Sequence, residues 1–218
     1  MALVPDVKAF CERCLKTERW NGKVILMVVD AVFTSVGLNY FTAVVPKVIE
    51  FEKRFVEPGE IADLRSLSNA RLEKLREVWK NTRSWKAAKE AAQYLSTLGK
   101  DDKQALRSWA LSSDLEGWRE NPLGRIKGIG INTYQYLRMM GGVDTVMPDK
   151  IVKRVINNIL REAGFREEWD DIRFVRKVEW MAAETGYRPI ELCWMTWLIQ
   201  REGKLIRMEK YSSLLNRI

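Results

Sequence analysis

The chain has 218 residues, of which 46% are apolar and 30% charged, so its composition excludes a disordered polymer and predicts a buried core. Lysine and arginine exceed the acidic residues by eight, which favours nucleic acid over a membrane as partner, although a merely basic soluble protein would look the same. The sequence lacks histidine, which excludes Ser-His-Asp and Cys-His catalysis and histidine-based zinc sites.

The N-terminal region carries two of the three cysteines, Cys11 and Cys14, and the third is Cys193. A tetrahedral zinc site or a four-thiolate cluster needs four ligands, so we expect no metal site and place Cys11 and Cys14 on one face of a helix. A redox motif is the alternative. The longest apolar run, Val24–Val29, is too short to cross a bilayer, and Asp6 argues against a secretory signal. We therefore expect a cytoplasmic protein without a membrane partner.

Helical periodicity dominates the rest of the chain. We predict a buried helix from Val24 through Phe33 and an amphipathic helix that begins at a Ser84 cap and stops at Gly99. Further helices are predicted over Ile131–Met140, between Pro148 and Gly164, and from Pro189 to Gly203. Few segments alternate with period two, so the predicted class is all-α with about ten short helices. Most of the nine tryptophans are expected in the core.

The segment from Ile126 to Thr133 has two glycines, Gly128 and Gly130, on either side of Ile129, and a predicted helix follows at once. This spacing permits a tight turn in which Ile129 points inward and the first amides of the next helix point outward. Such amides bind phosphate without reading sequence, and Arg125 and Lys127 flank the turn. Residues 119–154 contain seven basic and three acidic residues. An ordinary turn between helices is the alternative.

Asp149 lies nineteen residues beyond Gly130, directly after Pro148 and near the start of a predicted helix. Taken alone, this aspartate is best explained as a residue that complements the helix dipole. The two segments together resemble the helix-hairpin-helix DNA glycosylases, the superfamily of endonuclease III, adenine glycosylases and 8-oxoguanine glycosylases. The matching stretches are Ile126–Tyr134 and Pro148–Val155, and the helix from Val24 into residues 34–39 resembles the family's early helix and wedge loop.

The resemblance implies an all-α fold with two helical subdomains that flank a DNA-binding cleft, and a single glycosylase unit over residues 1–218. One subdomain would be a six-helix bundle over residues 21–142 that includes the helix-hairpin-helix at 119–141. The other would combine residues 1–20 and 143–218. The implied partner is double-stranded DNA, bound by a monomer through Arg125, Lys127, Gly128, Ile129, Gly130 and Lys153.

By the same resemblance, Asp149 would stabilise the cationic sugar and activate water while the target base is flipped out of the duplex. Asp30 is a second candidate, as an acid that protonates the leaving base; a capping or surface aspartate is the alternative. Asn132, Asn39 and Tyr40 are candidates for contacts with the substrate. No organic cofactor is expected, although a monovalent cation could bind the backbone carbonyls of residues 125–130, as in some relatives.

Departures from the family pattern sharpen the expected chemistry. Asn132 occupies the place of the Schiff-base lysine, which implies a monofunctional enzyme without lyase activity; a displaced lysine is the alternative. Asn39 is the nearest polar residue to the usual wedge glutamine, and the cysteine quartet for an iron–sulfur cluster is absent. The base that is removed stays open, and includes modified cytosine and hypermodified phage bases. A non-catalytic DNA-binding protein and a helical protein-interaction domain are the competing hypotheses.

Overall fold

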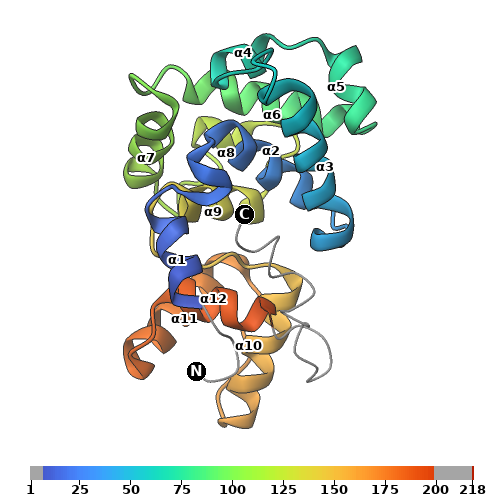
Figure 1. The fold of residues 1–218 in the computed structure, drawn as a ribbon. Helices are drawn as coiled ribbons and strands as arrows, with labels where there is room; N and C mark the ends of the chain where they lie inside the picture. Colours follow the sequence, from blue (N-terminus) through green and yellow to red (C-terminus); the bar gives the residue numbers. More distant parts are fainter. Residues whose placement is uncertain (1–6, 199–217) are drawn as a thin grey trace.

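A computed structural model describes residues 7–198 and Ile218, and the part of the chain within these bounds is all-α (Figure 1), as the periodicity predicts. Short helical turns of 3₁₀ or π type supplement the α-helices among these residues. In chain order the elements are α1 (Val7–Leu15), η1 (Arg19–Gly22), α2 (Val24–Thr34), η2 (Tyr40–Val44), α3 (Val45–Phe51), η3 (Glu52–Val56), α4 (Leu64–Asn69), α5 (Leu72–Val78), α6 (Thr82–Leu95), α7 (Asp102–Ser112), α8 (Pro122–Arg125), α9 (Ile131–Met140), α10 (Lys150–Glu162), α11 (Asp171–Thr185) and α12 (Pro189–Leu198).

Helix α2 forms the centre of the fold. Every residue from Val24 to Phe33 is buried, and the helix packs against α3, α6, α7 and α9. A helix that is apolar on all sides is stable only when neighbours surround it. The prediction of a buried helix from Val24 through Phe33 is therefore confirmed.

Helix α6 shows where sequence signals for helix ends succeed and fail. Asn81 caps the helix because its side-chain oxygen accepts hydrogen bonds from the amides of Arg83 and Ser84. The predicted Ser84 cap was wrong by one turn. The helix ends at Leu95, and the chain bends before it reaches Gly99, where a side chain would overlap the backbone of Ala105.

Other predicted elements are close to those observed. Helix α9 has the predicted bounds, α10 is slightly shorter than the predicted Pro148–Gly164 segment, and α12 begins at Pro189. The predicted end at Gly203 lies outside the described residues. Cys11 and Cys14 are both buried on α1, as expected, and Cys193 is buried on α12. Most tryptophans are buried, but Trp169 and Trp180 are exposed.

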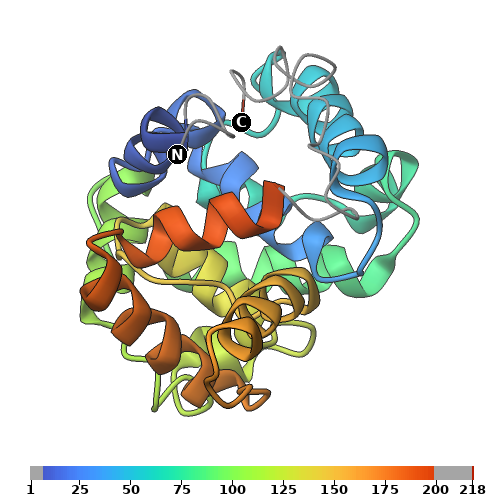
Figure 2. The ribbon, with the colours of Figure 1, turned by 90° about the horizontal axis from the view of Figure 1, so that it is seen from below.

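The helices form two groups (Figure 1). Helices α10 and α11 pack against α12, which also packs against α1, whereas α3 to α9 form the other group together with the central helix α2. The view from below shows α12 crossing the middle of the molecule between α1 and α10 (Figure 2). The connection from α9 to α10, residues 141–149, therefore runs from one group to the other.

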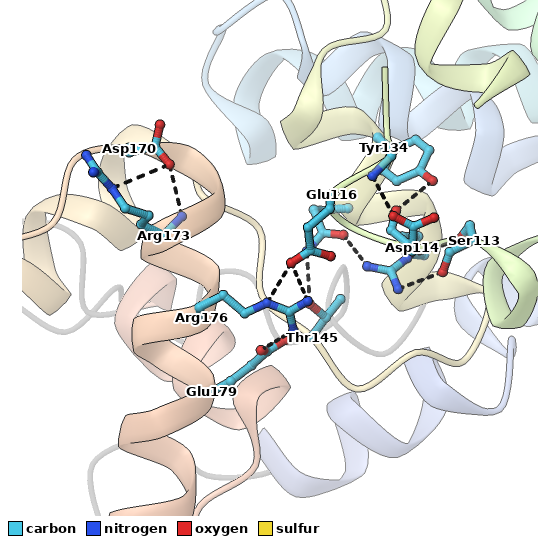
Figure 3. Close-up of polar contacts among 12 residues, drawn as sticks. Ser113, Asp114, Glu116, Tyr134, Thr145, Asp170, Arg173, Arg176 and Glu179 are labelled. Atoms are coloured by element: carbon cyan, nitrogen blue, oxygen red, sulfur yellow. Dashed lines mark hydrogen bonds and ion pairs between the residues drawn. The ribbon is translucent and has the colours of Figure 1, made fainter. Parts of the chain in front are cut away.

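An ion pair on the surface also joins the two groups. The guanidinium of Arg176 on α11 donates to the Glu116 carboxylate in the segment between α7 and α8, and also to Glu179 (Figure 3). Hydrogen bonding to Arg176 holds the pKa of Glu116 below its usual range. Because both side chains are exposed, we expect this pair to contribute little to stability.

No helix in the described part of the chain is long and apolar enough to cross a membrane, since the longest α-helix there has 15 residues.

Candidate functional site

The turn over residues 126–130 joins α8 to α9. The amide of Ile129 donates to the carbonyl of Ile126 at 3.0 Å, and Gly128 adopts a φ of +114°, which side chains rarely allow. Ile129 is buried, whereas Arg125 and Lys127 are exposed. The turn therefore has the predicted arrangement of an inward apolar residue and outward cations.

The start of α9 has no cap. Gly130 has no side chain to accept a hydrogen bond, and the amides of Ile131, Asn132 and Thr133 have no acceptor among the described residues. Amides left open at a helix N-terminus favour an anion. Gly130, which precedes these amides, is exposed, whereas Ile131 and Thr133 are themselves buried.

Two of the backbone carbonyls predicted to hold a cation are already engaged. The carbonyl of Ile126 accepts from Ile129, and that of Gly130 accepts from Tyr134. Within the described residues, no group of three or more acidic or cysteine side chains could hold a metal ion.

Asn132 is half-buried near the start of α9, and its side-chain oxygen is buried without a hydrogen-bond donor in the described part of the chain. A buried acceptor without a donor costs free energy, so such an atom is a good contact point for a ligand N–H.

Asp149 caps α10. One oxygen, Oδ1, accepts from the amides of Ile151 and Val152 at 2.7 and 2.8 Å, and Oδ2 accepts no hydrogen bond from any described residue. No cation pairs with this carboxylate among the described residues. Burial raises its pKa, and the two amides oppose that shift. Asp149 is thus held in a fixed orientation with one oxygen uncommitted.

The surroundings of Asp149 come from both helix groups. Gln135 on α9 donates to Thr145 and to the carbonyl of Val146, which fixes the connecting segment that leads to Asp149. The Cys193 thiol on α12 is a neighbour of this segment. Burial raises the pKa of the thiol, a hydrogen bond with the Met147 backbone lowers it, and the nearby charge of Asp149 raises it. Asp149 therefore lies where the connecting segment meets α12.

Asp30 is buried inside α2, as expected for the candidate acid, so the alternative of a surface aspartate is wrong. It is 0% exposed, and its Oδ2 accepts from Trp20, Tyr40 and Tyr136 at 2.9 to 3.0 Å and from Arg19 at 3.4 Å. Burial raises its pKa, and Arg19 and the three hydrogen bonds lower it. The carboxylate is saturated by protein donors, so its contacts favour a structural role over proton donation to a base.

Arg19 completes this core cluster, which we define as Arg19, Trp20, Asp30, Tyr40 and Tyr136. Its guanidinium also makes cation–π contacts with three aromatic rings, those of Phe10, Tyr136 and Trp194. Tyr40 was expected to contact the substrate, but its hydroxyl lies inside this cluster. Spacing in the sequence gave no signal for the cluster, because its members come from η1, α2, η2 and α9.

The loop between α2 and η2 was expected to present Asn39 as the wedge. Instead, the Asn39 side chain accepts from the amide of Thr42 and caps η2. Two apolar side chains of this loop are exposed beside Asn39, which is exposed as well: Leu38 is 50% exposed and Val36 is 39% exposed. An apolar pair beside Gly37 in a polar loop was the signal that could have identified them.

Lys153 was expected to contact DNA, but it is buried against α11. Its ammonium donates to the carbonyl of Trp169 and to the Asp171 carboxylate, and it lies over the ring of Phe174. These contacts hold the start of α11 against α10 and leave the ammonium engaged within the protein.

Comparison with known proteins gave no assignment: no family model, no curated protein and no solved structure matches the chain.

Proposed function

We propose that the protein is a monofunctional DNA glycosylase of the helix-hairpin-helix kind, which flips out a damaged or modified base and hydrolyses its glycosidic bond. The observation that carries this proposal is Asp149, whose carboxylate is half-buried and fixed by two amides, with one oxygen that accepts no hydrogen bond from the described residues. The uncapped start of α9 beside Arg125 and Lys127 supports binding to the DNA backbone.

The reaction requires a negative charge next to the sugar. As the bond between C1′ and the base nitrogen breaks, its electron pair leaves with the base and positive charge develops on the sugar. The free oxygen of Asp149 stabilises this charge and accepts a proton from water as the water oxygen bonds to C1′. The proposal needs no covalent enzyme intermediate, because Asn132 lacks the amine that would form one.

Base release from a panel of duplexes tests the proposal. The panel contains oxidised guanine, uracil, alkylated purines and glucosylated cytosine, each compared with the unmodified duplex. We expect release from at least one duplex, and a loss of about 10²–10³-fold in rate for Asp149→Asn. Asparagine can still cap α10, so retained DNA binding and an unchanged melting temperature show that the variant is folded.

Borohydride trapping on the same substrate tests the monofunctional mechanism. Since Asn132 cannot form an imine with the sugar, we expect no covalent adduct. An adduct would show that a lysine elsewhere acts as the nucleophile.

Leu38 is the residue that we propose fills the gap left by the flipped nucleotide. Apolar side chains inserted between base steps hold a duplex open. Leu38 is exposed in a loop whose C-terminal end is fixed by the Asn39 cap. Leu38→Ala should reduce base release by about tenfold. Leu111→Ala on α7 is the matched control, because Leu111 is also exposed. Equal effects of the two variants would exclude a wedge at Leu38.

A DNA-binding protein without catalytic activity is the second candidate, since capping of α10 alone gives Asp149 a structural role. This candidate predicts salt-dependent DNA binding without base release from any duplex of the panel.

A further inference from the structure

Exposed cations lie at the start of α6 and on both sides of the glycine turn over residues 126–130. Five exposed cations on α6, before it and beside the turn have no ion-pair or hydrogen-bond partner for their charged groups among the described residues: Lys80, Arg83, Lys86, Arg125 and Lys127. On α11, by contrast, Arg173 and Arg176 each pair with two carboxylates.

The start of α6 lies directly against the turn. A Cβ atom built on Gly128 would lie 3.3 Å from the Cβ of Ala87 and 3.5 Å from the Nε of Arg83. Arg83 and Ala87 are four residues apart, so they share the face of α6 that packs on the turn. Lys86 is three residues beyond Arg83, and Lys80 immediately precedes the Asn81 cap. Arg83 therefore lies beside the turn, and Lys80 and Lys86 are each three residues from Arg83 along the chain.

Cations held this close without counter-charges repel one another, and a polyanion relieves that repulsion. Each DNA strand carries one phosphate per 3.4 Å of helix axis, so a strand held at the turn presents its next phosphates within reach of α6. We infer that the start of α6 is a second backbone-binding element, and that consecutive phosphates of one strand pass over the turn and then over Lys80, Arg83 and Lys86.

This inference rests on the proposed function for its partner, DNA, but not on catalysis. Side chains that contact only phosphates carry no sequence information. These cations should therefore bind duplexes of different sequence with equal affinity.

The test compares two triple variants with equal loss of charge. The first is Lys80→Gln/Arg83→Gln/Lys86→Gln. The second, a control, is Lys53→Gln/Lys100→Gln/Lys103→Gln, which removes exposed cations from η3 and from the region before and at the start of α7. Fluorescence anisotropy gives the Kd for an undamaged duplex at several salt concentrations. We expect the α6 variant to reduce the slope of log Kd against log salt by about 2–3, since each lost phosphate contact removes about 0.9. The control should leave the slope within about 0.5 of the wild-type value.

The outcomes separate this inference from the glycosylase proposal. Equal slopes for the two variants would overturn the second binding element while base release could still succeed. A reduced slope for the α6 variant alone would support it even if no duplex releases a base. If wild-type protein shows no salt-dependent binding, both the binding element and a DNA substrate are wrong.

Discussion

Two aspartates, Asp30 and Asp149, were candidates for the same chemistry, and the fold treats them in opposite ways. Asp30 lies in the core cluster, where four donors converge on one of its oxygens. Asp149 lies at a helix start, where two amides fix one oxygen and the other accepts no hydrogen bond within the described part of the chain. Burial raises the pKa of both. A shifted pKa alone therefore does not distinguish a catalytic carboxylate from a structural one; the number of donors already bound does.

The largest effect that this comparison predicts is a loss of folding stability when Asp30 is replaced. Asp30→Asn removes the counter-charge of the fully buried Arg19, and removal of one partner of a buried pair costs about 3–5 kcal/mol. Urea denaturation measures this loss, with Asp149→Asn as the matched control. Addition of Arg19→Met to Asp30→Asn should restore part of the stability. If Asp30→Asn unfolds at the wild-type urea concentration, the core cluster does not hold the fold together.

The pH dependence of base release tests the role of Asp149 in this comparison. The ionised form of Asp149 is the active one, so activity should fall about tenfold per pH unit below its pKa. Because burial raises this pKa, the midpoint should lie above the usual aspartate value of about 3.9. Single-turnover rates between pH 3.5 and 8, with circular dichroism at each pH, measure this limb. A midpoint below about 3.9 would contradict the assignment of the limb to Asp149.

The smallest expected effect concerns the stability of α10. Asp149→Ala removes the cap and should cost about 1 kcal/mol. Asparagine keeps the acceptor and carries no charge. Since the raised pKa means that folding favours the protonated carboxyl, the stability from this group is present below pH ~3.9 and is lost as pH rises through the folded pKa. At pH 7 the expected order of Tm is Asn at or above wild type, and Ala lowest.

Local patterns predicted the helices well because each depends on residues within a few turns. The apolar run from Val24 and the stripe of α6 gave correct helices, and the Gly-Ile-Gly spacing gave the turn before α9. The Ser84 cap was misplaced because Asn81, one turn earlier, caps the helix and accepts a hydrogen bond from the amide of Ser84 itself. Local patterns do not reveal which side chains form hydrogen bonds or ion pairs with distant parts of the chain.

The candidate site was harder to predict for that reason. Tyr40 and Asp30 meet Tyr136 across about a hundred residues, and Lys153 is engaged by the Trp169–Asp171 segment. Asn39 and Leu38 are exposed neighbours in the loop, yet the side-chain oxygen of Asn39 is engaged in the cap of η2. Residue type identifies candidate residues, but only tertiary contacts show which of their polar atoms remain able to bind a substrate.

The core cluster also determines how much of the N-terminal region can be removed. Arg19 and Trp20 supply two of the four donors to the Oδ2 oxygen of Asp30, and Trp20 and Asn21 are held in left-handed conformations with φ of 51° and 55°. A shortened protein that starts at Lys23 would keep α2 but remove the cationic partner of the buried Asp30, which would retain the hydroxyls of Tyr40 and Tyr136 as donors. We therefore expect such truncations to accumulate in the insoluble fraction on expression, although the deleted residues lie far from Asp149 in the sequence.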